Sequence, residues 1–175
     1  LLGRAAAVKS LGGSASKDRA DSCSVSTRRL IAELPSIAWL RPDPRTPGIR
    51  MSNVAFDVAG TSAAHAPSVK SVGITGQMTG SRVDYIIADD VEVVNNSETA
   101  AQREKLRVLI AEMGGAILTP KSKAGEHGGV VFLGTPQVED SLYNHLPEMG
   151  YTFRTWTSEV PDNLEKYSGT LAPSL

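Results

Sequence analysis

Two adjacent aspartates directly follow a mostly apolar run near the middle of the 175-residue sequence. The run, residues 83–88, has the sequence VDYIIA, and Asp89, Asp90 and Glu92 come after it. An aspartate at the end of a central strand can hold Mg²⁺ together with the water molecules of the ion. A carboxylate one residue later can polarise a water molecule for attack on a phosphate. The pattern therefore predicts phosphate chemistry, although paired aspartates also form ordinary turns and caps.

A second polar motif follows another apolar run. Residues 130–134 read VVFLG, and Thr135, Pro136 and Gln137 continue the chain. By itself this motif is more typical of a turn that ends a strand than of a binding site. In a parallel α/β sheet, however, ligands lie outside the carboxyl ends of the strands. Both motifs are expected at that edge.

The elements that must position these motifs alternate along the chain. The segments expected as strands are residues 53–58, 68–74, 83–88, 130–134 and 151–156. A helix is expected at residues 17–34, a second one capped by Asn96 or Ser97, and a short one at residues 138–146. Such alternation predicts an α/β fold with a mainly parallel sheet flanked by helices. Residues 1–12 do not read as an apolar strand. We further expect the strands that carry the two motifs to be parallel neighbours.

Composition excludes several classes of protein. The 18 basic and 19 acidic residues give a net charge of −1, so no overall basic field indicates nucleic-acid binding. Cys23 is the single cysteine, which excludes an internal disulfide framework. No run approaches the roughly 18 apolar residues of a membrane span. The composition indicates a soluble intracellular protein, and the start without Met indicates a fragment.

Several long motifs occur in a fixed order. They are SVKSVGITGQMTGSRVDYIIADDVEVVNNS from residue 68, REKL from 103, FLGTPQVEDSLY from 132 and GYTFRTW from 150. In this order and spacing they resemble the ATPase domain of the large terminase subunit, the DNA-packaging motor of tailed bacteriophages, in the type found in short-tailed lytic phages. The resemblance extends from about residue 14 almost to the end of the chain.

The resemblance implies a RecA-like P-loop core that uses ATP and Mg²⁺. By position, Asp89 matches the Walker B aspartate that holds Mg²⁺, and Asp90 takes the place of the usual catalytic glutamate. Because aspartate is one methylene shorter, Glu92 is a possible substitute. Arg82 is a candidate for the arginine that reaches a neighbouring subunit's ATP, although its position two residues beyond the glycine favours an ordinary surface arginine.

The GTPQ motif matches the family's coupling motif. In this reading Thr135 senses the γ-phosphate, and Gly134 and Gln137 belong to the same nucleotide-contacting segment. The whole family member is expected to act as a homo-oligomeric ring on the procapsid, with viral double-stranded DNA, the portal protein and the small terminase subunit as partners. Its place is the cytoplasm of the infected bacterial host, with no membrane involved.

No GxxxxGK[ST] motif occurs in the sequence, so the phosphate-cradling Walker A loop is expected upstream. Residues 1–175 are accordingly interpreted as a partial terminase ATPase domain that lacks the Walker A region and the C-terminal nuclease domain. By itself such a piece is expected to be inactive.

Two alternatives remain open at this point. The first is a metal-dependent nuclease that uses several carboxylates. Its candidate ligands are Asp57, Asp84, Asp89, Asp90 and Glu92. The second is a non-catalytic remnant of a motor that only docks to a portal or to DNA. A structure separates the first from a motor, because a nuclease gathers carboxylates from several strands whereas a motor places the aspartates beside Thr135.

Overall fold

The computed structural model describes residues 10–61, 66–76, 83–113, 128–159, 161–167 and 170–171. The strands are β1 (Ser10–Ser14), β2 (Ala55–Phe56), β3 (Val69–Gly73), β4 (Tyr85–Asp89) and β5 (Gly129–Leu133). The α-helices are α1 (Lys17–Glu33), α2 (Val94–Ser97), α3 (Ala100–Glu112) and α4 (Leu142–His145), and the 3₁₀ helices are η1 (Pro35–Leu40) and η3 (Leu164–Tyr167). Within these ranges, no helix combines the length and apolar character needed to cross a membrane.

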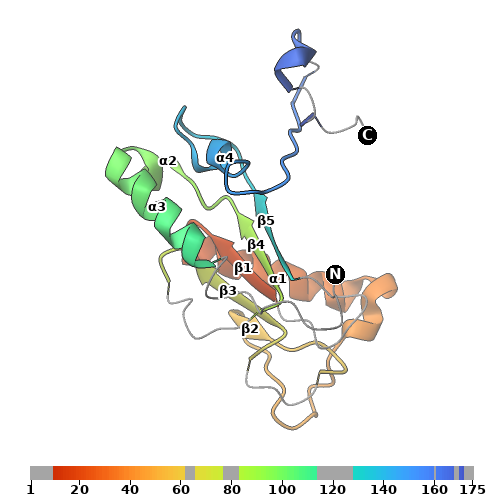
Figure 1. Ribbon diagram of the computed structural model, residues 1–175. Coiled ribbons are helices and arrows are strands. Elements are labelled where there is room, and N and C mark those ends of the chain that lie inside the picture. Colours follow the sequence, from red (N-terminus) through yellow and green to blue (C-terminus); the bar gives the residue numbers. More distant parts are fainter. Residues whose placement is uncertain are drawn as a thin grey trace.

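The strands form one sheet in the order β2-β3-β1-β4-β5. β1 pairs in parallel with β3 and β4, and β4 pairs in parallel with β5. Only the two-residue edge strand β2 is antiparallel to its neighbour. The predicted α/β class with a mainly parallel sheet flanked by helices is therefore confirmed (Figure 1).

The central strand was not expected from the sequence. β1 contains Gly12 and Gly13 and contributes Leu11 as its one large apolar side chain, so it lacks the apolar run that usually marks a buried strand. A Cβ atom added at Gly13 would lie 3.5 Å from Met113 Cε, which shows how closely the C-terminal end of α3 approaches this strand. A small residue thus suits β1 where a long apolar one would not.

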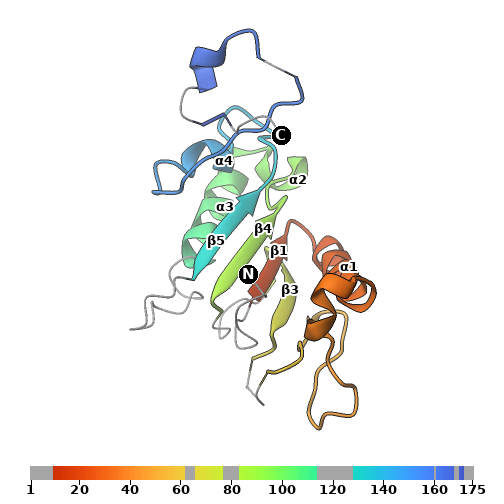
Figure 2. The same cartoon turned by 90° about the vertical axis from the view of Figure 1, so that its right-hand side faces the viewer.

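The two faces of the sheet are covered differently (Figure 2). One face carries the main core, in which Leu106 and Ile110 of α3 pack on Leu11 and Ile86. On the other face α1 packs over β1 and β3, and Asp21 of α1 accepts a hydrogen bond from Ser71 Oγ at 2.8 Å. The β4 and β5 half of that face has no covering helix among the described residues. Its exposed apolar side chains are Ile87, Val131 and Leu133.

The long helix begins later than its sequence suggested. Thr99 caps α3: its hydroxyl accepts a hydrogen bond from the Gln102 backbone N–H, and the Gln102 side chain accepts one from the Thr99 N–H. The predicted caps Asn96 and Ser97 lie instead in the short helix α2. Both positions are polar residues before an apolar-periodic segment, but only Thr99 has a glutamine three residues later, which completes a capping box.

Three other predicted elements are absent or shorter in the structure. Residues 151–156 form no strand; only an isolated bridge joins Thr155 to Leu171. Tyr151 instead packs edge-on against Phe132 of β5, with ring centroids 5.1 Å apart. The strand predicted at 53–58 shortens to β2, and the helix predicted at 138–146 shortens to α4.

An ionic cluster joins α3 to α4, and it makes stability depend on pH. Asp140 accepts hydrogen bonds from His145, Arg103 and Arg107, which lower the pKa of Asp140 to about 2. The Asp140 and Glu148 carboxylates raise the pKa of His145, although the nearby Arg107 opposes this. Asp140 therefore contributes to the free energy of unfolding at pH values above its pKa in the unfolded chain, and this contribution is lost as the pH falls toward about 2. His145 contributes to the free energy of unfolding at pH values below its pKa in the unfolded chain. This contribution is lost as the pH rises through the raised pKa of His145 in the folded protein.

We accordingly expect His145→Gln to lower the free energy of unfolding most near about pH 5 and progressively less above about pH 7. The effect should be small because these side chains are partly exposed and screened by solvent. Urea unfolding of the wild type and the variant across this range measures the difference. A difference that does not vary with pH would contradict the assignment.

Candidate functional site

The ends of β4 and β5 meet at one edge of the sheet, as expected. Asp89 pairs with Leu133 in the parallel register, and the Asp90 N–H donates to the Leu133 carbonyl at 2.9 Å. Thr135 comes two residues after Leu133. The predicted parallel pairing of these two strands is confirmed, and the aspartates and Thr135 share an edge.

Asp90 has an uncommon backbone conformation. Its φ is +45°, and among the described non-glycine residues it alone has a positive φ. Its carbonyl accepts a hydrogen bond from Ala15 N–H at 3.2 Å, so the residue bridges the ends of β1 and β5. Left-handed backbone at a non-glycine residue is costly, but less so for Asp and Asn than for most residues. This conformation lifts the Asp90 side chain off the sheet edge, where it is about half exposed.

Among the described residues, Arg19 of α1 forms an ion pair with this carboxylate. Arg19 Nη1 lies 3.3 Å from Asp90 Oδ2, and both side chains are largely exposed. Such an exposed pair adds little stability, but it places a guanidinium at the strand edge. Sequence reasoning missed Arg19 because the strand before α1 was missed. If β1 had been recognised, the first turn of α1, which follows it directly, would have been expected at this edge of the sheet.

The residues at the edge surround a depression of about 390 Å³. Its lining residues are Arg19, Asp90, Glu92, Val93, Val94, Asn95, Thr135 and Gln137. Four predicted site residues, Asp90, Glu92, Thr135 and Gln137, thus come together from the segments that follow β4 and β5. The Gln137 side-chain amide donates to the Thr135 carbonyl at 3.0 Å, which makes the Thr135–Gln137 turn compact.

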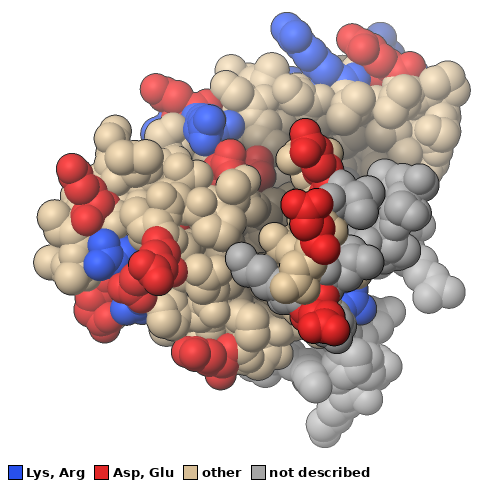
Figure 3. All heavy atoms as spheres, turned by 90° about the horizontal axis from the view of Figure 1, so that it is seen from above, with Lys and Arg blue, Asp and Glu red and all other residues tan. Residues whose placement is uncertain are grey.

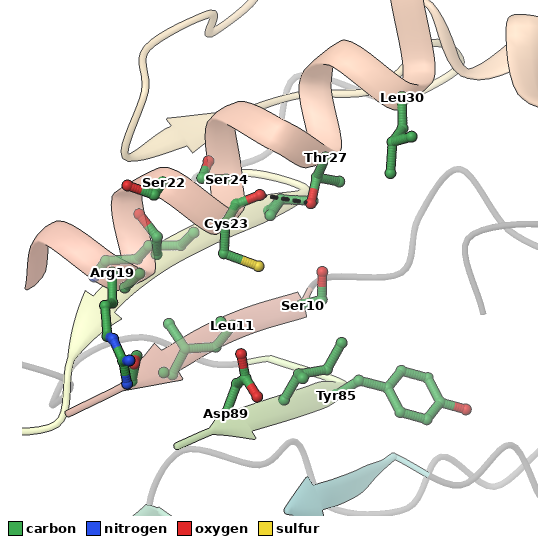
Figure 4. A pocket seen from close by; sticks show the side chains of 18 of the residues that line it. Ser10, Leu11, Arg19, Ser22, Cys23, Ser24, Thr27, Leu30, Tyr85 and Asp89 are labelled. Atoms are coloured by element: carbon green, nitrogen blue, oxygen red, sulfur yellow. Dashed lines mark hydrogen bonds between the residues drawn. The ribbon is translucent and has the colours of Figure 1, made fainter. Parts of the chain in front are cut away.

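Asp89 does not line the depression, whereas Asp90 lines both the depression and a second, larger space. The Asp89 side chain lies on the sheet face that carries α1, at the end of a groove of about 830 Å³ between α1 and the strands (Figure 4). Cys23 and Thr27 of α1 project toward the same groove, and Tyr85 lines it from β4. The groove is largely apolar, and its charged residues on the strand side are Lys70, Asp89 and Asp90.

The residues fit a magnesium site of the water-rich kind. In the described ranges, no three His, Cys, Asp or Glu side chains gather to form a protein-only metal site. Mg²⁺ is usually held by one or two carboxylates together with water and phosphate oxygens. The exposed Asp89 carboxylate, with open space in front of it, fits such a ligand. The same finding gives no support to the nuclease alternative, which needs several gathered carboxylates.

Gly134 is required by packing against α4. A Cβ atom there would lie 2.0 Å from Tyr143 Oη and 2.3 Å from Tyr143 Cζ. The Tyr143 hydroxyl donates to the Leu133 carbonyl at 3.3 Å, and burial raises the pKa of Tyr143 to about 12, so it keeps its proton at neutral pH. The path of the chain into Thr135 therefore depends on the absence of a side chain at Gly134.

Glu92 is held differently from the two aspartates. Its side chain is 1% exposed, and both carboxylate oxygens already accept hydrogen bonds from donors in residues 137–142. This environment favours Asp90 over Glu92 as the carboxylate that can reach a substrate. Arg82, the candidate arginine finger, lies outside the described residues.

The face seen from above carries many Asp and Glu side chains, with Lys and Arg scattered at its margins (Figure 3). On the described part of this face the basic residues form no stripe of the kind that binds DNA phosphates.

Comparison with known proteins shows a similarity to a phage protein. No protein-family model matches the sequence. The chain is 46% identical over 166 residues to the terminase large subunit of Enterobacteria phage T3. The match covers 93% of this chain but 27% of that relative, so the chain spans about a quarter of the relative's length.

Proposed function

Because 93% of the chain is related in sequence to the terminase large-subunit family, we propose that its longer protein hydrolyses ATP to drive viral double-stranded DNA into a procapsid. In this proposal residues 1–175 are part of a RecA-like P-loop ATPase core. One observation carries the proposal. The parallel pairing of β4 with β5 brings Asp90 and Thr135, from motifs 45 residues apart in the sequence, into one depression at the carboxyl edge of the sheet.

The residues at this edge have separate roles in the proposal. Asp89 holds Mg²⁺, which neutralises phosphate charge when MgATP is bound. Asp90 accepts a proton from the attacking water and orients it. Thr135 contacts the γ-phosphate through its hydroxyl, and Gly134 and Gln137 shape the turn that presents it. Arg82 keeps its proposed role as an arginine finger toward a neighbouring subunit.

The bare half of the sheet also supports this proposal. Parallel sheets are normally covered on both faces, yet Ile87, Val131 and Leu133 are exposed beside Asp89. We propose that the Walker A segment of the longer protein covers this apolar surface and brings the phosphate-binding loop to the two aspartates.

The partners follow from the family. We propose that the longer protein assembles as a ring on the procapsid portal in the cytoplasm of the infected host, with the portal protein and the small terminase subunit as partners.

The direct test is phosphate release by the longer protein in the presence of MgATP, with and without double-stranded DNA. Hydrolysis that requires Mg²⁺ and rises with DNA is the expected result. A well-folded, full-length protein that releases no phosphate under either condition would overturn the proposed function.

The 175-residue chain alone should show no rise in melting temperature with millimolar MgATP. It contains no Walker A motif, so ATP lacks the backbone N–H groups and the lysine that supply most phosphate contacts in such sites. A ligand stabilises a fold only when its concentration exceeds its dissociation constant. The longer protein, melted in parallel, should show a clear rise. A rise for the short chain would mean that it holds a complete nucleotide site.

A further inference from the structure

The buried carboxylate of Glu92 joins the segment after β4 to the segment after β5. Glu92 Oε1 accepts hydrogen bonds from Ser141 Oγ at 2.7 Å and from the Gln137 N–H at 3.2 Å, and Oε2 accepts one from the Leu142 N–H at 2.6 Å. Ser141 is also fully buried, and its hydroxyl accepts a hydrogen bond from the Tyr143 N–H. The three donors lie 45 to 50 residues away in the sequence.

These contacts hold both ends of the segment that follows Thr135. Gln137 lies two residues after Thr135, and Ser141 and Leu142 begin α4. Residues between them, such as Glu139, are exposed. A buried carboxylate is tolerated only where its hydrogen bonds are satisfied, and losing one of them is costly. Glu92 therefore fixes both ends of this segment to the chain that follows β4, while Asp140 within the segment pairs with Arg103 and Arg107 of α3.

We propose that Glu92 is a positioning residue, which holds Thr135 and Gln137 at the correct distance from Asp90. Glu92 follows Asp90 by two residues, so the same short segment carries the exposed carboxylate and the anchor for the opposite wall of the depression. Any movement of the 134–142 segment relative to β4 must stretch these hydrogen bonds. The proposal rests on the proposed ATPase function for its catalytic consequence, but the anchoring itself can be tested without ATP.

The competing role for Glu92 is to polarise the attacking water. Glu92 lines the depression, but its side chain is only 1% exposed and its carboxylate oxygens already accept hydrogen bonds from three donors. Asp90, two residues earlier, is about half exposed and faces the same depression. The two roles predict different behaviour when Glu92 and its partner Ser141 are changed.

The anchoring is tested by residue-resolved amide hydrogen exchange on the 175-residue chain. Glu92→Gln keeps the size of the side chain but has one acceptor oxygen in place of two, so at least one of the three donors loses its partner. We expect exchange at Gln137 or Leu142 to be at least about tenfold faster, with no change at Ile110 in the core. The matched control Glu139→Gln, which removes a carboxylate from the exposed part of the same segment, should leave both rates unchanged. Unchanged rates in Glu92→Gln would overturn the proposal.

The catalytic consequence is tested in the longer protein by a double-mutant cycle. Glu92→Gln and Ser141→Ala should each lower kcat by about five- to thirtyfold with little change in nucleotide affinity. The kcat of the double variant should be close to that of the less active single variant, because both substitutions disrupt the same hydrogen bond. If Glu92 polarises the water instead, Glu92→Gln alone abolishes hydrolysis and Ser141→Ala stays near wild type, which would overturn positioning. A wild-type protein without hydrolysis would overturn the proposed function, whereas the exchange result would still decide the anchoring.

Discussion

Asp90→Asn in the longer protein should lower the rate of ATP hydrolysis by at least about 100-fold while nucleotide binding stays within a few-fold of wild type. The substitution removes the charge that accepts a proton from water but preserves the shape of the side chain. It is also well matched to the backbone. At a φ of +45° most side chains are strained, but asparagine adopts this conformation as readily as aspartate. Loss of the exposed pair with Arg19 should change stability little.

Asp84→Asn is the matched control for this variant. It makes the same change of charge just before the N-terminal end of β4, whereas Asp90 follows the C-terminal end of that strand. Hydrolysis should stay close to wild type in Asp84→Asn, and thermal melts should show that both variants are folded. Turnover can be measured by phosphate release, and binding by a fluorescent nucleotide. Full hydrolysis in Asp90→Asn would remove Asp90 from the catalytic role, and would return Glu92 to consideration.

The strands that carry the motifs could be predicted because their sequence signals are local. Residues 83–88 and 130–134 are short apolar runs that end on polar residues, and their pairing follows from the general arrangement of parallel sheets. β1 could not be found in this way. Its two glycines leave no apolar pattern, and the contact of Gly13 with Met113 comes from tertiary packing that the local sequence does not reveal.

The candidate site shows the same division. The aspartates and Thr135 stand out as polar residues at strand ends, so their convergence could be anticipated. The anchoring by Glu92 could not, because its partners lie up to 50 residues away and two of the three are backbone N–H groups, which any residue other than proline provides. Arg19 escaped notice for a related reason: its position depends on β1. A carboxylate close in sequence to proposed catalytic aspartates, as Glu92 is, can therefore serve as a structural anchor. Its burial and its hydrogen bonds distinguish that role from a catalytic one.

Gly134→Ala should lower the free energy of unfolding by about 1–3 kcal/mol and should reduce turnover in the longer protein. The added methyl group would lie 2.3 Å from Tyr143 Cζ, and Tyr143 is only 3% exposed, so the ring cannot swing away without disturbing the core. Either the tyrosine or the chain leading to Thr135 must move. Because Thr135 is the next residue, we expect the strain to reach the proposed γ-phosphate contact.

Gly129→Ala, at the other end of β5, is the control, since no heavy atom lies within 4 Å of its added Cβ. Both variants remove a glycine from the same strand region, so they share the change in unfolded-chain entropy and differ in the collision with Tyr143. Tyr143→Leu, made in each background, tests that cause directly. Gly134→Ala should cost less stability when the ring is already absent. If Gly134→Ala unfolds at the same urea concentration as Gly129→Ala, Tyr143 does not constrain the chain at Gly134.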